Sequence, residues 1–194
     1  MKQNKTHTIR PAALAALLAA FTPQALNAAV EDVTTQYIIN ATFDGNKTPW
    51  NIVSNMSNTT QENHTQEFWT SDTSNGYFQM SQTANDLPDG FYRLTANGFT
   101  RSGGETAQQT CLYAISGGKE YATPLKLLHS ETAAYGSTPD NTAEASEAFS
   151  KGYWLNTIDG IEVTGGKLTI GARNCGQLRA GTSNGSWTIL GNVR

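Results

Sequence analysis

The chain has 194 residues, of which 15% are charged, and its formal net charge at pH 7 is −3. Its 13 Lys and Arg residues form no basic run, which argues against a surface that binds nucleic acid. Thr, Asn and Ser account for 55 residues, a composition that favours strands and turns over helices with Glu- and Lys-rich faces.

The first 29 residues have the pattern of a secretory signal peptide. Three basic residues precede the apolar run Ala12–Phe21, and the small residues Ala28 and Ala29 follow it. A ten-residue apolar run is too short to span a bilayer. We therefore expect a helical signal peptide over residues 1–29, export to the periplasm, outer surface or medium, and no membrane insertion after its removal. A membrane-anchoring helix is the alternative. Residues 30–194 suit one domain.

Alternating apolar and polar residues predict many short strands in residues 30–194. Pairs such as Asp89-Gly90 and Gly117-Gly118 separate several of them as turns. Half-buried strands of this kind build a β-sandwich or barrel and not a parallel α/β core. The expected strands are Thr35–Asn40, Trp50–Ser54, Gln66–Thr70, Tyr77–Thr83, Gly90–Thr100, Thr106–Ser116, Pro124–Leu128, Asp159–Val163, Lys167–Asn174 and Ser186–Val193.

One segment has a helical pattern instead. Residues Thr142–Lys151 are rich in Ala and Glu and are followed by Gly152. Because glycine after the last turn commonly ends a helix, we predict a two-turn helix with Gly152 at its C-cap. Residues 130–141 before it are expected to form a loop.

The two cysteines, Cys111 and Cys175, both lie in strand-like runs. An exported protein allows a disulfide between them, but spacing does not decide between one bridge and two buried thiols.

The sequence offers no constellation of residues typical of an enzyme. Outside the leader its only histidines are His64 and His129, and it contains neither an HExxH nor a CxxC motif. Residues 181–185 match GxSxG, but the motif precedes a predicted strand, whereas a nucleophile elbow opens a helix. We predict a protein that is not an enzyme, and a small hydrolase ranks last among the alternatives.

Aromatic residues beside polar ones give the best functional signal. A sugar ring presents an apolar C–H face to an aromatic plane and hydroxyls at its edge, so sugar sites combine Trp or Tyr with polar side chains. We expect weak carbohydrate binding by five residues that offer these types: Trp69, Glu67, Arg101, Tyr153 and Trp154. Burial in the core is the open alternative for the two Trp residues and Tyr153. Trp50 and Trp187 each begin an apolar alternation, so they are expected in the core.

Several motifs resemble a known family. The opening, with Asp32–Asn40, Phe43-Asp44-Gly45 and Trp50, is similar to that of carbohydrate-binding modules. Six further motifs, in order, resemble secreted Bacteroidetes domains of the galactose-binding-like β-sandwich: Glu67–Trp69, Gln79–Gln82, Leu87–Leu94, Gly98–Arg101, Gly166–Gly171 and Trp187–Ile189. The resemblance covers about residues 32–194.

The resemblance implies a jelly-roll β-sandwich whose partner is a polysaccharide or other glycan. It also implies a structural calcium ion beside Asp44, although the expected second acidic ligand is replaced near Asn192 by an amide, which weakens the case for calcium. Because a fold does not settle function, the alternative is a structural or protein-interaction module at the cell surface, with a surface protein as partner and no glycan site.

Overall fold

The structure is a computed structural model that describes residues 30–45, 49–56, 61–71, 76–101, 110–175 and 186–194. The chain divides into two compact units, Met1–Glu31 and Asp32–Arg194. The expected signal-peptide helix and the GxSxG motif lie outside the described residues. Within those residues, no helix is both long and apolar enough to cross a membrane.

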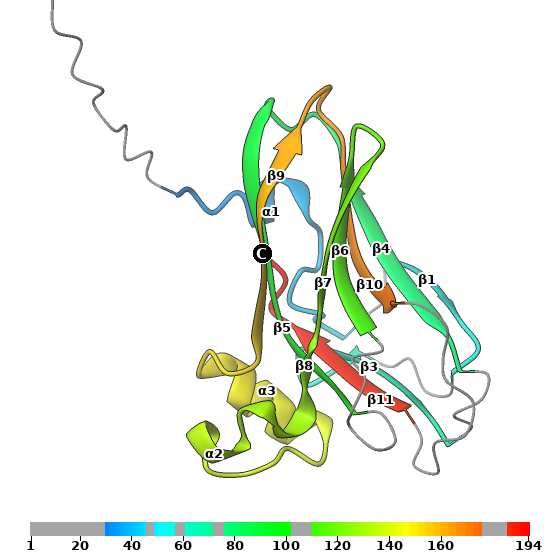
Figure 1. Cartoon of the computed structure of the whole chain (residues 1–194), viewed down its shortest axis with the longest axis vertical. Helices are drawn as coiled ribbons and strands as arrows, with labels where there is room; N and C mark the ends of the chain where they lie inside the picture. The colour runs from blue at the N-terminus through cyan, green and yellow to red at the C-terminus, as the bar shows by residue number, and fades with distance from the viewer. Residues whose placement is uncertain (1–29, 46–48, 57–60, 72–75, 102–109, 176–185) are drawn as a thin grey trace, which may run out of the picture. The chain divides into compact units, whose positions relative to one another are not determined.

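The second unit is a sandwich of two β-sheets (Figure 1). Sheet A has the strand order β1-β4-β10-β6-β7, and sheet B has the order β2-β3-β11-β5-β8, with β9 paired to β5. Neighbouring strands are antiparallel except for the short parallel pair of β5 and β8. The strands are β1 (Asn51–Ser54), β2 (Gln61–Glu62), β3 (Thr65–Thr70), β4 (Phe78–Ala84), β5 (Gly90–Arg101), β6 (Thr110–Ser116), β7 (Lys119–Pro124), β8 (Lys126–Leu127), β9 (Leu155–Val163), β10 (Leu168–Asn174) and β11 (Ser186–Gly191). The predicted all-β, jelly-roll sandwich is confirmed.

The main core lies between the two sheets. Sheet A contributes Met80 and Ile170, while sheet B contributes Phe68 and Leu190, and all four side chains are buried. Burial of each such side chain stabilises the fold by about 1.5–3 kcal/mol. Because successive strand residues point to opposite faces, these inward positions fix their neighbours on the outer face of each sheet.

Helices cover part of the outer face of sheet B (Figure 1). They are η1 (Leu128–Ser130), α2 (Thr132–Tyr135) and α3 (Thr142–Ser150), while α1 (Thr34–Tyr37) lies near the start of the unit. Ala145, Ala148 and Phe149 of α3 join Phe99 and Ile189 of sheet B in a second buried cluster, which we call the helix–sheet cluster.

The ends of α3 agree with the sequence prediction. At its start, the Asn141 side chain accepts a hydrogen bond from the Glu144 N–H at 2.9 Å. At its end, Gly152 has a left-handed φ of 85°. The Gly152 N–H donates to Phe149 O and the Tyr153 N–H donates to Ala148 O, the bonding pattern of a Schellman motif. The predicted helix and its glycine stop are therefore confirmed.

The strand predicted over Thr35–Asn40 is wrong, because this segment begins in the helical turn α1. The Asp32 carboxylate accepts a hydrogen bond from the Thr34 N–H at 3.0 Å, which holds the chain in a turn. Further on, the buried Gln82 side chain donates to Ile39 O and accepts from the Ile39 N–H, at 2.9 and 2.8 Å. The Gln82 side chain thus forms both backbone hydrogen bonds that a neighbouring strand would otherwise form with Ile39.

The strand predicted over Pro124–Leu128 is partly confirmed, because Pro124 ends β7 and Lys126–Leu127 form β8, but most of β7 was not predicted. The chain turns at Gly117 and Gly118, with φ of 56° and 78°, and returns as β7 over Lys119–Pro124. Two consecutive positive φ values are typical of a tight hairpin turn. Strand β7 is an edge strand of mainly exposed and half-buried residues, so it lacks the apolar alternation that would have predicted it.

The cysteine pair forms a disulfide, which decides between the two alternatives left open by the sequence. Cys111 lies on β6 and Cys175 directly follows β10, and their Cα atoms are 5.3 Å apart. The bridge joins two strands that are already neighbours in sheet A.

Candidate functional site

Three of the predicted glycan-binding residues come together on the outer face of sheet B. In the strand register, Trp69 of β3 lies opposite Trp187 of β11, and Trp187 lies opposite Arg101 of β5. Residues directly opposite each other share a face of the sheet. Glu67 is two positions before Trp69 and shares that face. We call Glu67, Trp69, Arg101 and Trp187 the tryptophan platform.

Trp187 forms the buried floor of the tryptophan platform. Its ring is 6% exposed, and its Nε1–H donates to Glu67 Oε1 at 2.6 Å. The guanidinium carbon of Arg101 lies 5.1 Å from the centroid of the Trp187 ring, within the range of a cation–π interaction. Trp69 is 40% exposed. The platform therefore combines an accessible aromatic ring with an acidic side chain and a basic one.

The helix–sheet cluster supports the platform from one side. The ring centroid of Phe99 lies 5.3 Å from that of Trp187, 5.5 Å from that of Trp154 and 5.8 Å from that of Phe149. All three contacts have the edge-to-face geometry that aromatic rings favour. Trp187 is thus fixed by its hydrogen bond on one side and by packed rings on the other.

Trp154 does not belong to a binding surface, and this part of the sequence prediction is corrected. Its ring is fully buried, and its Nε1–H donates to the carbonyl oxygens of Leu127 and Leu128. Its backbone N–H donates to the carboxylate of Glu131. The ring packs in the helix–sheet cluster, and its Nε1–H is hydrogen-bonded within the protein. Trp154 is therefore a core residue, which was the alternative to a binding role.

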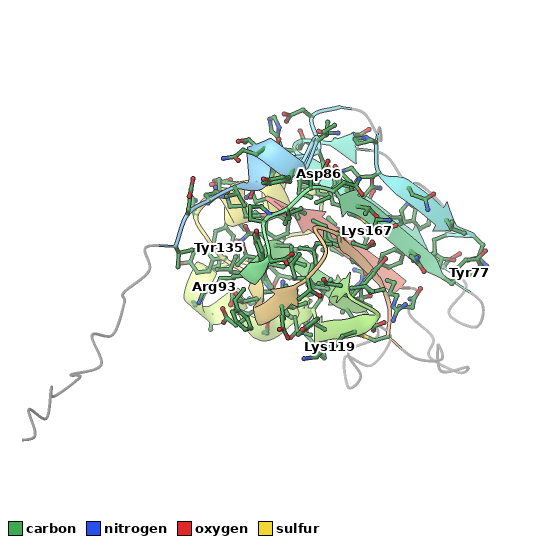
Figure 2. The ribbon with its side chains drawn as sticks, turned by 90° about the horizontal axis from the view of Figure 1, so that it is seen from above. Tyr77, Asp86, Arg93, Lys119, Tyr135 and Lys167 are labelled. Atoms are coloured by element: carbon green, nitrogen blue, oxygen red, sulfur yellow. A yellow bond between two sulfur atoms is a disulfide. The ribbon has the colours of Figure 1, made fainter. Side chains whose placement is uncertain are left out.

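Tyr153 is half-buried and lies with α2. Its ring centroid is 5.0 Å from that of Tyr135, and its hydroxyl donates to Ala134 O at 3.2 Å. Figure 2 labels Tyr135 on the side of the molecule that carries the helices. These contacts give Tyr153 a packing role beside α2.

Trp50 is buried in the main core, as predicted. Trp187 is also buried, but the prediction of a purely core role missed its contacts with Glu67 and Arg101. Residues 67 and 187 become neighbours only through the pairing of β3 with β11. A polar–apolar alternation within one strand carries no information about that pairing, so the sequence held no local signal for it.

Asp44 is engaged by side chains rather than by a set of acidic ligands. Its Oδ1 contacts His64 Nδ1 at 2.5 Å, and its Oδ2 accepts a hydrogen bond from the Thr42 hydroxyl at 2.9 Å. The hydrogen bond with His64 is the largest of the effects that lower the pKa of Asp44. Among the described residues, no group of three or more His, Cys, Asp or Glu side chains lies together. Since Ca²⁺ takes six to eight oxygen ligands, a calcium ion beside Asp44 would need oxygen ligands beyond these side chains.

Comparison with known proteins adds a structural likeness. No protein-family model and no curated protein matches the sequence. The fold is similar to that of TmCBM61, solved in complex with β-1,4-galactotriose, with a TM-score of 0.52 and 19% identity over 81% of this chain and 94% of that chain. A second similar structure is the enzymatically active domain of tailspike protein 4 from bacteriophage CBA120, with a TM-score of 0.43 and 10% identity over 81% of this chain and 20% of that chain. The first likeness shows that the chain shares the fold of a carbohydrate-binding module.

Proposed function

We propose that the chain is an exported, non-catalytic protein that binds a glycan at the tryptophan platform. The observation that carries the proposal is the exposed ring of Trp69 in register with Trp187 and Arg101 on one face of the sheet. Trp69 stacks on the C–H face of a sugar, while Arg101 and Glu67 bind the hydroxyls at its edge. The expected affinity is millimolar to micromolar, or about −4 to −8 kcal/mol.

Two further observations support this proposal. The fold is shared with a module that was solved with a bound galactotriose. The disulfide between Cys111 and Cys175 is typical of proteins in an oxidising compartment, and it supports the export that the leader pattern predicts.

A glycan array with the full chain tests the proposal, using the wild type, Trp69→Ala and the control Phe91→Ala. Phe91 is another exposed aromatic residue of sheet B, at 78% exposure, but it lies on β5 ten positions before Arg101. Ten strand residues span about 33 Å, so Phe91 is remote from the platform.

We expect at least one glycan to be retained by the wild type and by Phe91→Ala, and to be lost by Trp69→Ala. Circular dichroism establishes that each variant is folded. Equal retention by a folded Trp69→Ala variant rejects the platform as the site. An array without any reproducible hit from folded protein rejects glycan binding, and would favour a surface module that recognises protein.

A further inference from the structure

A hollow opens beside α3 on the same outer face of sheet B as the tryptophan platform. Along β5, Thr95 and Asn97 line this hollow, Phe99 lies in the helix–sheet cluster against α3, and Arg101 belongs to the tryptophan platform. The hollow has a volume of about 650 Å³, within the range of small-molecule sites. Its other lining residues include Asp44, His64, Leu155, Asn192 and Arg194, and we call it the Asp44 hollow.

Two residues that line the Asp44 hollow have left-handed backbone geometry. Seven non-glycine residues in the described part of the chain have φ between 49° and 59°, a region that side chains disfavour. His64 and Asn192 line the hollow. Phe43, Asn63 and Trp154 each precede a lining residue in the chain, and the Asn40 side chain accepts a hydrogen bond from the Asp44 N–H. Residues kept in such conformations concentrate at ligand-binding sites, where the surrounding structure holds them in place.

The side chains in the hollow are already oriented. Asn97 is buried, and its Nδ2–H donates to Tyr153 O at 2.7 Å. Asn192 Nδ2 donates to Asn97 Oδ1 at 3.3 Å. Asp44 is held by His64 and Thr42, as described above. A ligand would therefore meet fixed polar groups, and less ordering would oppose its binding.

The chemistry of these groups favours an uncharged ligand with many hydroxyls. Asp44 accepts hydrogen bonds and Arg194 donates them, while the amide of Asn192 can do both. A sugar hydroxyl also donates and accepts, so it suits such a mixed lining. An anionic ligand would instead face the Asp44 carboxylate, which like any carboxyl of ordinary pKa is charged at neutral pH. Leu155, at 43% exposure, offers an apolar surface for the C–H groups of a sugar.

We infer that the Asp44 hollow is a second saccharide site, which takes a neutral sugar and works without the tryptophan platform. The inference rests on the proposed function in one respect, namely that the tryptophan platform and the Asp44 hollow both bind glycans. One chain would then contact a polysaccharide at two points, and the two contacts would raise the overall affinity by acting together.

The test uses the full chain carrying Trp69→Ala, so that the platform is disabled, and follows backbone amide signals by NMR. The four neutral probes are β-1,4-galactotriose, cellotriose, mannotriose and xylotriose, and the charged probe is trigalacturonate. The first added variant is Asn192→Gly, which removes the amide while glycine tolerates the φ of 49° at that position. The matched control is Asp86→Gly, because Asp86 has a similar φ of 59° but is not among the residues that line the hollow.

We expect at least one neutral probe to shift the signals of Asn97, Gly152 and Leu155 in a saturable way. Asn192→Gly should weaken this binding at least about tenfold, while Asp86→Gly should leave it unchanged. The inference is overturned if none of the neutral probes shifts these signals, if only trigalacturonate does, or if Asn192→Gly binds as tightly as the control. The glycan array tests the tryptophan platform, whereas the NMR experiment uses a chain that lacks the Trp69 ring. A negative result on the array therefore does not decide the result for the Asp44 hollow.

Discussion

The hydrogen bond between Trp187 and Glu67 should contribute measurably to stability as well as to the shape of the platform. The Trp187 ring is 6% exposed, so loss of its acceptor leaves a buried N–H without its partner. An unsatisfied buried donor costs about 1–3 kcal/mol. Because Glu67 is only half-buried and water can reach it, we expect Glu67→Ala to lower the free energy of unfolding by about 1.5 kcal/mol. Glu67→Gln retains an acceptor oxygen and should lose less than about 0.5 kcal/mol.

A double-mutant cycle separates this bond from the other contacts of Glu67. Trp187→Phe keeps an aromatic ring but removes the donor, so the cycle combines Glu67→Ala, Trp187→Phe and the double variant. Urea unfolding gives the four free energies, and we expect a coupling energy of about 1 kcal/mol. The indole N–H signal of Trp187 should also move in Glu67→Ala and much less in Glu67→Gln. A coupling energy below about 0.3 kcal/mol would refute the argument that this bond fixes Trp187.

Three further predictions concern the platform, the disulfide and the Asp44 hollow. The exposed 40% of Trp69 is about 100 Å² of a ring that can bury up to about 250 Å², so Trp69→Ala should weaken glycan binding by up to about 2.5 kcal/mol in isothermal titration calorimetry. Replacing Cys111 and Cys175 by Ser opens a loop with a sequence separation of 64, and urea unfolding should show a loss of about 4 kcal/mol. His64→Ala should raise the pKa of Asp44 towards its ordinary value in a carboxyl NMR titration, since His64 lowers it in the fold. The stability that Asp44 contributes is complete above its unfolded pKa and is lost as the pH falls through the lower folded pKa.

The elements predicted correctly are those whose signals are local. Strand β5 alternates within its own sequence, and α3 has its glycine stop directly after it. The predicted strand over Thr35–Asn40 failed because Gln82, more than forty positions later, supplies the hydrogen bonds of a strand partner to Ile39. No window of neighbouring residues contains that information.

The candidate site was likewise predictable only in part from the sequence. Residue types alone selected Glu67, Trp69 and Arg101, and the register of β3, β11 and β5 places them together. Residue type could not show that Trp69 is exposed and Trp154 is buried, because burial depends on the tertiary structure. Trp154 is enclosed by the helix–sheet cluster, whereas Trp69 lies on an outer strand position with 40% of its surface exposed.

The helices cover only part of the outer face of sheet B, and an aromatic ring is exposed beside the covered part. The outward row at Phe99 and Ile189 is covered by Phe149 and the small side chains of α3. Two residues away along each strand, the next outward-facing row contains Arg101, Trp187 and Trp69. Within that row exposure rises from the buried Trp187 to the accessible Trp69. The row on which α3 packs is therefore buried, whereas Trp69 in the neighbouring row keeps 40% of its surface exposed.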